Sequence, residues 1–88
     1  MLSEEHLREV LRAIPGVAEA NAYAEGSKLV AVVVSPTFEN VEEHVRQTMV
    51  WDVLLDQLSE AEQADVAYVF TNTPGEKANA EAKAAAGG

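Results

Sequence analysis

The sequence contains no cysteine, and this absence excludes several kinds of chemistry at once. Without a thiol the chain cannot form a disulfide, bind a metal through thiolates or use a cysteine nucleophile. Basic residues are also scarce, with 6 Lys and Arg against 15 Asp and Glu, and the formal net charge is −9. Nucleic acids and anionic membranes are both bound mainly by cationic side chains. The composition therefore predicts that neither nucleic acid nor a membrane is a partner.

Long apolar stretches are missing as well. None approaches the about 20 residues that a membrane-spanning helix needs. The N-terminal MLSEEHLREV carries too many charges for a signal peptide. We therefore expect a cytoplasmic protein. Its 88 residues suffice for one small domain with a modest core, which we place over residues 1–75, followed by an Ala-rich flexible C-terminal tail over residues 76–88.

The acidic charge is unevenly distributed. Residues 36–75 hold 8 acids and one base, Arg46, whereas residues 1–35 hold 5 acids and 3 bases. Such a surplus has two explanations that stay open here. It can simply keep the protein soluble, or it can form a surface that attracts a basic partner.

Two stretches have the apolar spacing of amphipathic helices. The first is predicted over residues 4–13, between a Ser3 cap and a stop at Pro15-Gly16, and its inward face consists of Leu7, Val10, Leu11 and Ile14. The second is predicted over residues 41–57, where Asn40 and Glu43 have the spacing of a capping box. Its inward stripe is Val45, Met49, Val50, Val53, Leu54 and Leu58. A repeat of the capping-box spacing at Ser59 and Glu62 predicts a short third helix over residues 60–64.

Three other stretches are typical of strands. Residues 17–24 alternate small alanines with polar side chains, which predicts a strand with one wet face. A tight turn at residues 25–27 leads into residues 29–34, which are apolar on both faces and should be well covered. Ser35-Pro36 ends this strand, because proline cannot donate to the ladder. Residues 66–71 form the last strand.

The resulting order, α-β-β-α-α-β, predicts an α+β fold in which helices pack on one face of a three-stranded sheet. The tail EKANAEAKAAAGG favours helix but has no bulky residue with which to dock. We expect it to be frayed or disordered.

The corner between the second strand and the long helix resembles a family signature. Residues 33–40, VVSPTFEN, are similar to the corner of the BolA proteins, where Val-Val-Ser is followed by two residues and Phe-Glu-Gly. Asn40 stands at the Gly position, and both residues tolerate left-handed backbone angles. Arg46-Gln47-Thr48 has the spacing of the family's Arg-His-Arg, and residues 71–76, TNTPGE, resemble its Thr-x-Thr-Pro-Glu-Glu ending. The resemblance covers roughly residues 7–76 and implies a BolA or type II KH-like fold.

The resemblance also implies a function, namely partnership with a monothiol glutaredoxin in iron–sulfur trafficking. The family's cluster ligands are a His before the last strand and often a Cys or His between the first two strands. Here the first position is Asp65, residues 20–28 hold neither Cys nor His, and Gln47 replaces the helix His. Iron–sulfur clusters need thiolate or imidazole donors. We therefore predict no cofactor, and keep a glutaredoxin partner with non-standard ligands as the alternative.

Other candidate chemistry is sparse. His6 and His44 each fall in a first helical turn without a second histidine at metal-binding spacing, so we expect both on the surface and no metal site. Asp52 and Asp56 share a helix face that is best explained as solvated. We expect no catalytic residue and no enzyme. The third class, a KH-like nucleic-acid binder, lacks the GxxG loop and the basic residues that it needs.

One candidate interaction surface remains, made of Phe38, Arg46 and Trp51. Trp51 is either a core residue or an exposed anchor of the kind enriched in interface hot spots. We expect the Phe38 ring to fold back onto Val45 and Met49, so that the corner is mainly structural and a partner binds beside it. The sequence thus predicts a small, soluble, non-catalytic protein-interaction or regulatory domain. Its partner is an unidentified protein, for which a basic surface is one option, and a homodimer through a sheet edge is a further option.

Overall fold

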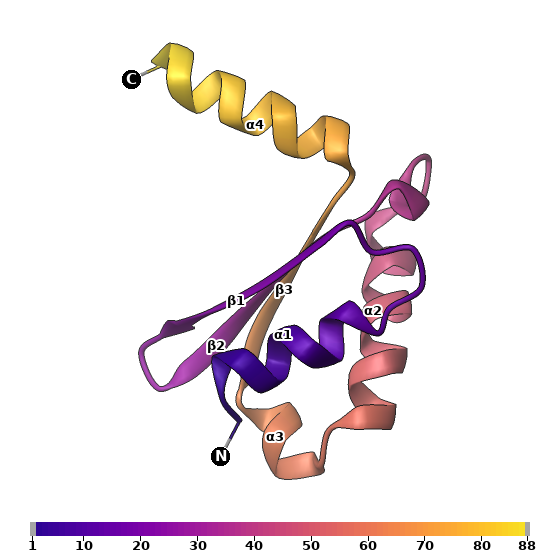
Figure 1. Cartoon of the computed structure of the whole chain (residues 1–88), viewed down its shortest axis with the longest axis vertical. Helices are drawn as coiled ribbons and strands as arrows, with labels where there is room; N and C mark the ends of the chain where they lie inside the picture. Colours follow the sequence, from indigo (N-terminus) through magenta and orange to yellow (C-terminus); the bar gives the residue numbers. More distant parts are fainter. Residues whose placement is uncertain (1, 88) are drawn as a thin grey trace.

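The computed structural model describes residues 2–87, and side chains for residues 2–83. The elements in order are α1 (Glu4–Arg12), β1 (Glu19–Glu25), β2 (Lys28–Val34), the 3-10 turn η1 (Pro36–Phe38), α2 (Glu43–Gln57), α3 (Glu60–Ala64), β3 (Val66–Asn72) and α4 (Pro74–Gly87) (Figure 1). The sheet order is β1-β2-β3, with β1 antiparallel and β3 parallel to β2. The predicted α+β fold with a three-stranded sheet is confirmed, and η1 and α4 are added to the predicted order.

Helix α1 has the predicted cap and the predicted inward face. The Ser3 hydroxyl accepts a hydrogen bond from the His6 N–H at 3.0 Å, and Leu7, Val10, Leu11 and Ile14 are buried. The chain then reverses at Gly16, whose φ of +80° suits glycine. A Cβ atom at Gly16 would lie 2.6 Å from the Thr37 methyl group, so this turn packs directly against the corner after β2.

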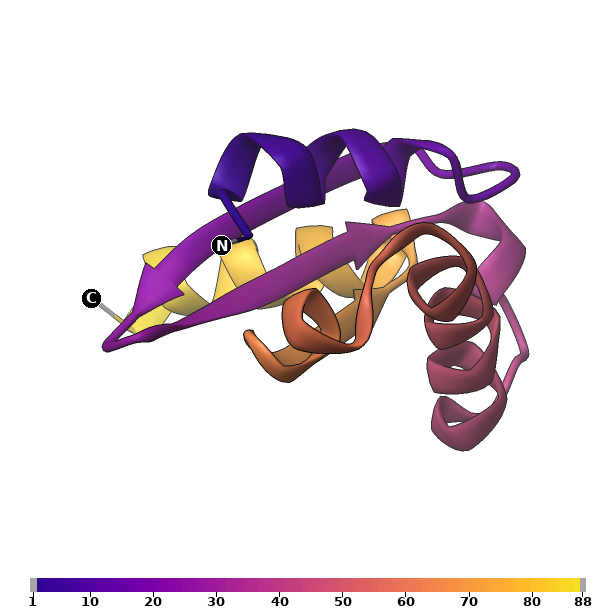
Figure 2. The same cartoon turned by 90° about the horizontal axis from the view of Figure 1, so that it is seen from below.

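The sheet has a covered face and an open one. Its register places Ala20, Val33 and Thr71 in one row and Ala22, Ala31 and Val69 in the next. These rows lie under α1 and α2, and α3 lies at the end of the sheet where β3 begins (Figure 2). Ala22 is fully buried, and its small side chain lets α1 lie close to the strand, as the alternation in the sequence predicted. Each large apolar side chain buried here contributes roughly 1.5–3 kcal/mol.

The start and the inward face of α2 differ from the prediction. Asn40 does not cap the helix: it has a φ of +60°, and the helix begins after Glu42, which makes no side-chain capping bond. The Val41 N–H instead donates to the Phe38 carbonyl oxygen, which closes a tight turn before the helix. The buried residues of α2 are Arg46, Val50 and Leu54, whereas Val45 is 41% exposed. The inward stripe is therefore rotated about the helix axis, so that Arg46 points inward in place of Val45.

The segment after β3 is the helix α4, in line with the helix preference of a tail that we predicted to be frayed or disordered. In α4 the Thr73 hydroxyl accepts from the Glu76 N–H at 3.1 Å, and a Glu76 carboxylate oxygen accepts from the Thr73 N–H at 2.9 Å. These two bonds form a capping box that starts the helix. Helix α4 projects from the side of the sheet away from α1 and α2, so the helices are not all on one face (Figure 1). The flexibility of residues 76–87 stays a prediction, and residue 88 lies outside the described residues.

Candidate functional site

The corner between β2 and α2 is held together by Ser35. Its hydroxyl donates to the Gly16 carbonyl oxygen at 3.0 Å and accepts from the Thr37 N–H at 3.1 Å. Ser35 is fully buried and caps η1. The Ser-Pro sequence therefore does more than end a strand, because it also joins the corner to the turn after α1.

Two of the three predicted interaction residues are inside the corner. Phe38 has no exposed surface, and Arg46 is 8% exposed with its guanidinium 5.7 Å from the centre of the Phe38 ring. Of the two residues onto which the ring was expected to fold, Met49 packs against the core cluster that contains Phe38, whereas Val45 is 41% exposed and lies outside that cluster. Phe38 and Arg46 thus cannot form a contact surface, since rotation of the α2 stripe brings Arg46 over the ring and covers both. Our expectation that the corner is mainly structural agrees with this burial.

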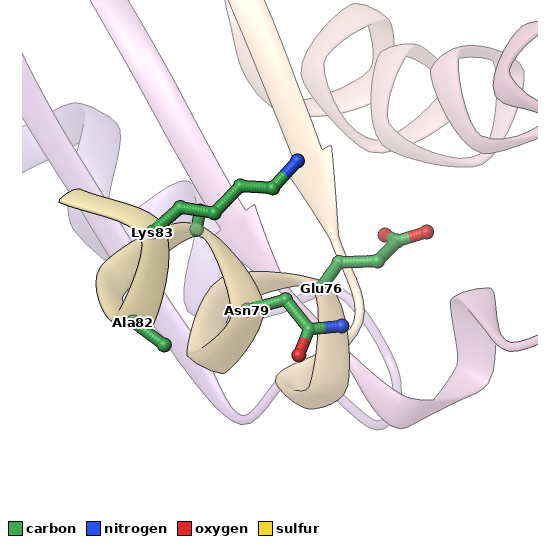
Figure 3. A pocket seen from close by; sticks show the side chains of 5 residues that line it. Glu76, Asn79, Ala82 and Lys83 are labelled. Carbon is green, nitrogen blue, oxygen red and sulfur yellow. The ribbon is translucent and has the colours of Figure 1, made fainter. Parts of the chain in front are cut away.

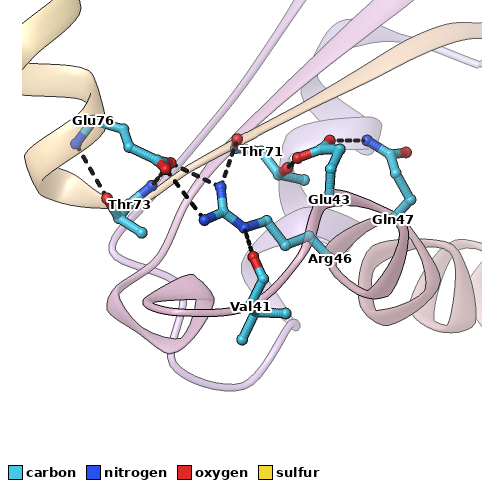
Figure 4. A network of polar contacts seen from close by, with 7 residues as sticks. All are labelled: Val41, Glu43, Arg46, Gln47, Thr71, Thr73 and Glu76. Carbon is cyan, nitrogen blue, oxygen red and sulfur yellow. Dashed lines mark hydrogen bonds and ion pairs between the residues drawn. The ribbon is translucent and has the colours of Figure 1, made fainter.

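Arg46 joins three parts of the molecule (Figure 4). Its Nε donates to the Val41 carbonyl oxygen at 2.7 Å, and its two Nη atoms donate to the Glu76 carboxylate at 2.7 and 3.2 Å. The hydrogen bonds from Arg46 lower the pKa of the Glu76 carboxyl, and the Thr73 N–H adds to this effect. The pair raises the pKa of Arg46 in turn. This Arg46–Glu76 pair attaches the first turn of α4 to α2.

The outer edge of β3 is covered by side chains of α2. Gln47 Nε2 donates to the Val69 carbonyl oxygen at 2.7 Å, and Arg46 Nη1 lies 3.5 Å from the Thr71 carbonyl oxygen. The Thr71 hydroxyl donates to the Glu43 carboxylate at 2.7 Å. Polar groups that would otherwise invite another strand are therefore satisfied within the chain.

The outer edge of β1 is blocked in a similar way. The Ala22 carbonyl oxygen accepts from Arg8 Nη2 at 2.9 Å, and the Ala22 N–H donates to the Asn21 side-chain oxygen at 2.9 Å. Both edges of the sheet thus carry side-chain partners in their middle. A homodimer through a sheet edge stays a prediction, and these contacts leave only short stretches of edge for it.

Trp51 is half-buried and packs against the core cluster, which matches the simpler of its two explanations. Beside it on the outer surface of α2 lies Leu55, which is 56% exposed, one helical turn further along. Asp52 and Asp56 are exposed on the same helix, as expected for a solvated face. Of the predicted interaction surface Phe38, Arg46 and Trp51, only Trp51 is partly accessible to solvent.

The two histidines lie on the surface. His6 Nε2 is 3.9 Å from a Glu62 oxygen, and His44 Nδ1 is 3.4 Å from a Glu42 oxygen. Within residues 2–87, no group of three or more His, Cys, Asp or Glu side chains converges to hold a metal ion. In the same range, no helix has the length and hydropathy to cross a membrane.

The positions that match the family's cluster ligands have structural partners here. Asp65 lies between α3 and β3, and its carboxylate accepts from the Leu2 N–H at 3.3 Å. Lys28, at the hairpin end, donates to the Ala64 carbonyl oxygen at 2.6 Å, so an ammonium group lies next to this junction. Gln47 is occupied with Val69 and with Glu43. Asp65 thus supplies a hydrogen bond where the family supplies a metal donor, and Gln47 does so at the position of the family's helix His.

A hollow on α4 is lined by residues of that helix alone, namely Glu76, Asn79, Ala80, Ala82 and Lys83 (Figure 3). The labelled side chains of Glu76 and Lys83 extend away from the helix, and no strand contributes to the lining. Without a second wall the hollow has no enclosed volume in which a small molecule would be surrounded.

The open face of the sheet carries a feature that the sequence analysis missed. Tyr68 and Phe70 on β3 are 63% and 50% exposed, and Tyr23 on β1 is 42% exposed. The Tyr68 and Phe70 rings stack with their centres 6.2 Å apart. Spacing by two along a strand signals a shared face, but the sequence gives no sign that this face stays uncovered.

Comparisons with known proteins agree with this fold. No family model matches the sequence, and no curated protein is significantly similar to it. A BolA protein homologue from Coxiella burnetii is 25% identical and superimposes with a TM-score of 0.62 over 89% of this chain and 99% of its own. The chain is BolA-like. A bol-like protein from Babesia bovis, 23% identical, has the same fold, with a TM-score of 0.65 over 92% of this BolA-like chain and 95% of its own.

Proposed function

We propose that this BolA-like chain is a small, non-catalytic protein-interaction domain whose partner is a basic protein. The observation that carries the proposal is the position of Arg46. It is the only Lys or Arg between residues 36 and 75, and its side chain is buried and paired with Glu76. The one positive charge of this half of the sequence is therefore neutralised inside the protein.

The acidic residues of the same segment, in contrast, face outward. They lie in the corner, along α2 and around α3, and all are exposed or half-exposed: Glu39, Glu42, Glu43, Asp52, Asp56, Glu60, Glu62 and Asp65. Fields of one sign attract oppositely charged proteins and speed their encounter. A net charge of −9 on 88 residues also repels nucleic acid and other acidic proteins. These features together favour a basic protein partner.

The alternative, a partner of monothiol glutaredoxin that shares an iron–sulfur cluster, has less support. Asp65 accepts a hydrogen bond from the Leu2 N–H at the position where the family has its late His ligand, and residues 20–28 hold no Cys or His. The Lys28 ammonium group lies beside the same junction, and while it is protonated it has no electron pair to donate to iron.

An enzymatic role has no group to support it among the described residues. Perturbed pKa values often mark catalytic residues, but here each has a structural cause. The pKa of Glu76 is lowered and that of Arg46 raised because the two side chains pair with each other. The pKa of Lys77 is raised by its pair with Glu19. The pKa of Glu62 is lowered because its carboxylate accepts a hydrogen bond from the Ser59 N–H.

In-cell cross-linking in the native host, followed by mass spectrometry, would identify the partner for direct titration. We expect a protein of positive net charge whose affinity falls as salt rises. The test variant carries Asp52→Asn and Asp56→Asn. It should bind the partner more weakly than the wild type at low salt, and the two affinities should become equal at high salt. A neutral or acidic partner with salt-independent affinity would contradict the proposal. Recovery of a glutaredoxin carrying a shared cluster would favour the alternative.

A further inference from the structure

The open face of the sheet presents aromatic rings in an ordered arrangement. In the register, Val30 on the central strand has Tyr23 on one side and Tyr68 on the other. The next row holds Asn21, Val32 and Phe70. Alternation along each strand puts these side chains on the face opposite to α1 and α2. We call the surface formed by Tyr23, Val32, Tyr68 and Phe70 the aromatic face. It spans all three strands.

The aromatic rings cover the central strand, but only part of their surface is buried by doing so. Val30 is fully buried although no helix other than α4 lies on its side of the sheet, so its aromatic neighbours shield it. Large parts of Tyr68, Phe70 and Tyr23 nevertheless remain in solvent. Contiguous exposed aromatic groups on a small soluble domain are characteristic of binding surfaces.

Helix α4 and its ion pair border one end of this face. Lys77 on α4 pairs with Glu19 on β1. A hollow beside Val32 is lined by Glu19, Ala20, Asn21, Val32, Val34 and Lys77. Glu25 is exposed at the opposite end of β1. The aromatic face thus has an acidic group at each end of the edge strand, while its centre is apolar.

Resting on the function proposed above, we propose that the aromatic face is the docking site for an arginine-bearing segment of the basic partner. Guanidinium groups bind over the faces of Tyr and Phe rings by cation–π attraction and stacking. The protein uses this same contact internally, where Arg46 lies over the Phe38 ring. The net charge of −9 draws such a segment to the molecule, and Glu25, exposed at the far end of β1, can pair with another of its cations.

Two other occupants fit the charge less well. A second copy of the chain would bring two molecules of charge −9 face to face. Single-stranded RNA also stacks on aromatic residues of open sheets, but it needs a basic surface to hold its phosphates. The acidic surroundings therefore favour an arginine-bearing protein segment over both.

The test is a titration with a short blocked peptide of alternating arginine and leucine, beside its counterpart with lysine in place of arginine. The affected variant carries Tyr68→Thr and Phe70→Thr, because threonine keeps the strand propensity of both positions. The control is Leu55→Gln on α2, which removes a similarly exposed apolar side chain far from this face in the fold. Thermal melts establish that both variants fold.

We expect the wild type and Leu55→Gln to bind the arginine peptide equally, and the double variant to bind about tenfold more weakly, as two lost cation–π contacts imply. The lysine peptide should bind the wild type more weakly than the arginine peptide. In wild-type NMR spectra, the peptide should shift the ring signals of Tyr23, Tyr68 and Phe70. Equal binding by the double variant, or equal loss in Leu55→Gln, overturns the inference.

Failure of the inference and failure of the proposed function can be told apart. If the cross-linked partner is basic but perturbs α2 instead of the ring signals, the domain binds a basic protein elsewhere and only the inference fails. If the wild type binds oligouridine RNA on this face and not the arginine peptide, the inference fails and an RNA role replaces it. If the cross-linked partner is acidic, the proposed function fails.

Discussion

Phe38 and Asn40 are single residues on which the corner between β2 and α2 depends. Phe38 fills the core at the end of η1, and Asn40 adopts the left-handed backbone that turns the chain toward α2. The sequence indicated both roles in outline, through the spacing of Val-Val-Ser and Phe-Glu-Asn. It did not reveal that Asn40 leaves the helix uncapped, because a capping box and a left-handed turn use the same residue types.

Replacing Phe38 should reveal its structural role. Phe38→Ala removes a fully buried ring and should lower the free energy of unfolding by about 3–5 kcal/mol, a large share of the about 5–15 kcal/mol of a typical domain. Denaturant melts measure this, with Leu55→Ala as an exposed control that should change little. A Phe38→Ala protein that melts like the wild type would place the ring on the surface and contradict the structure.

Substitutions at Asn40 test the backbone geometry. With a φ of +60°, Asn40→Gly should be nearly silent, whereas Asn40→Val should cost about 1–2 kcal/mol because a β-branched residue resists left-handed angles. Thermal melts of the two variants decide the matter. A harmless Asn40→Val would mean that this backbone is not left-handed in solution.

Among the elements, α4 depends most on a few contacts. Its first turn is attached through the Thr73–Glu76 capping box, the Arg46–Glu76 pair and the Lys77–Glu19 pair. The TNTPGE ending resembled the family, yet its capping box was not foreseen, and the poor docking of the alanines suggested an irregular tail. Pairing between Arg46 and Glu76, 30 residues apart, is a tertiary contact that local patterns do not contain.

The Arg46–Glu76 pair should make stability depend on acid. Pairing lowers the pKa of Glu76 in the folded state below its ordinary value of 4.5. The stabilisation is therefore fully present above the unfolded-state pKa and is lost as the pH falls through the lower folded-state pKa. Glu76→Gln should melt below the wild type at neutral pH, and the gap should close well below pH 4.5. A gap that stays constant with pH would exclude a charged pair.

The sheet edges provide a second test at this scale. Arg8 and Gln47 cover main-chain groups on the edges of β1 and β3. Exposed strand edges tend to pair with other chains. We expect Arg8→Ala with Gln47→Ala to self-associate more than the wild type in sedimentation experiments, while Leu55→Ala does not. Unchanged self-association would show that these side chains do not protect the edges.

Some features of the strands could be predicted from the sequence, and others could not. Their existence and order followed from the β-branched runs, and the alanines of β1 correctly marked its covered face. The same patterns could not tell that Tyr68 and Phe70 stay exposed, because that depends on where α4 leaves the sheet. Arg46, predicted as a surface residue, is internal because α2 packs through Arg46, Val50 and Leu54 and because the Arg46 guanidinium pairs with Glu76.

For the molecule as a whole, the acidic residues between residues 36 and 75 face outward, whereas Arg46, the one base of that segment, is buried. The BolA-like fold alone does not determine function, because one fold supports different sites. At the family's late ligand position this chain has Asp65, and at the position of the family's helix His it has Gln47. Asp65 and Gln47 serve the fold, and the chain has no cysteine.

Anaerobic cluster reconstitution with a monothiol glutaredoxin tests whether these substitutions prevent cluster binding. We expect no visible absorption or circular dichroism band that depends on this protein, because its ligand positions lack imidazole and thiolate donors. A variant with Asp65→His and Lys28→Cys, which restores both donor types, is the matched comparison. A protein-dependent band from the wild type would overturn the expectation.

The most direct test of the central claim is an NMR titration of the wild-type protein with the partner recovered from the native host. We expect the partner to be basic and its addition to shift the ring signals of Tyr23, Tyr68 and Phe70, with a response that weakens as salt is added. Leu55 and Trp51 should stay unchanged. An acidic partner, or shifts confined to α2 with the three rings unaffected, would contradict it.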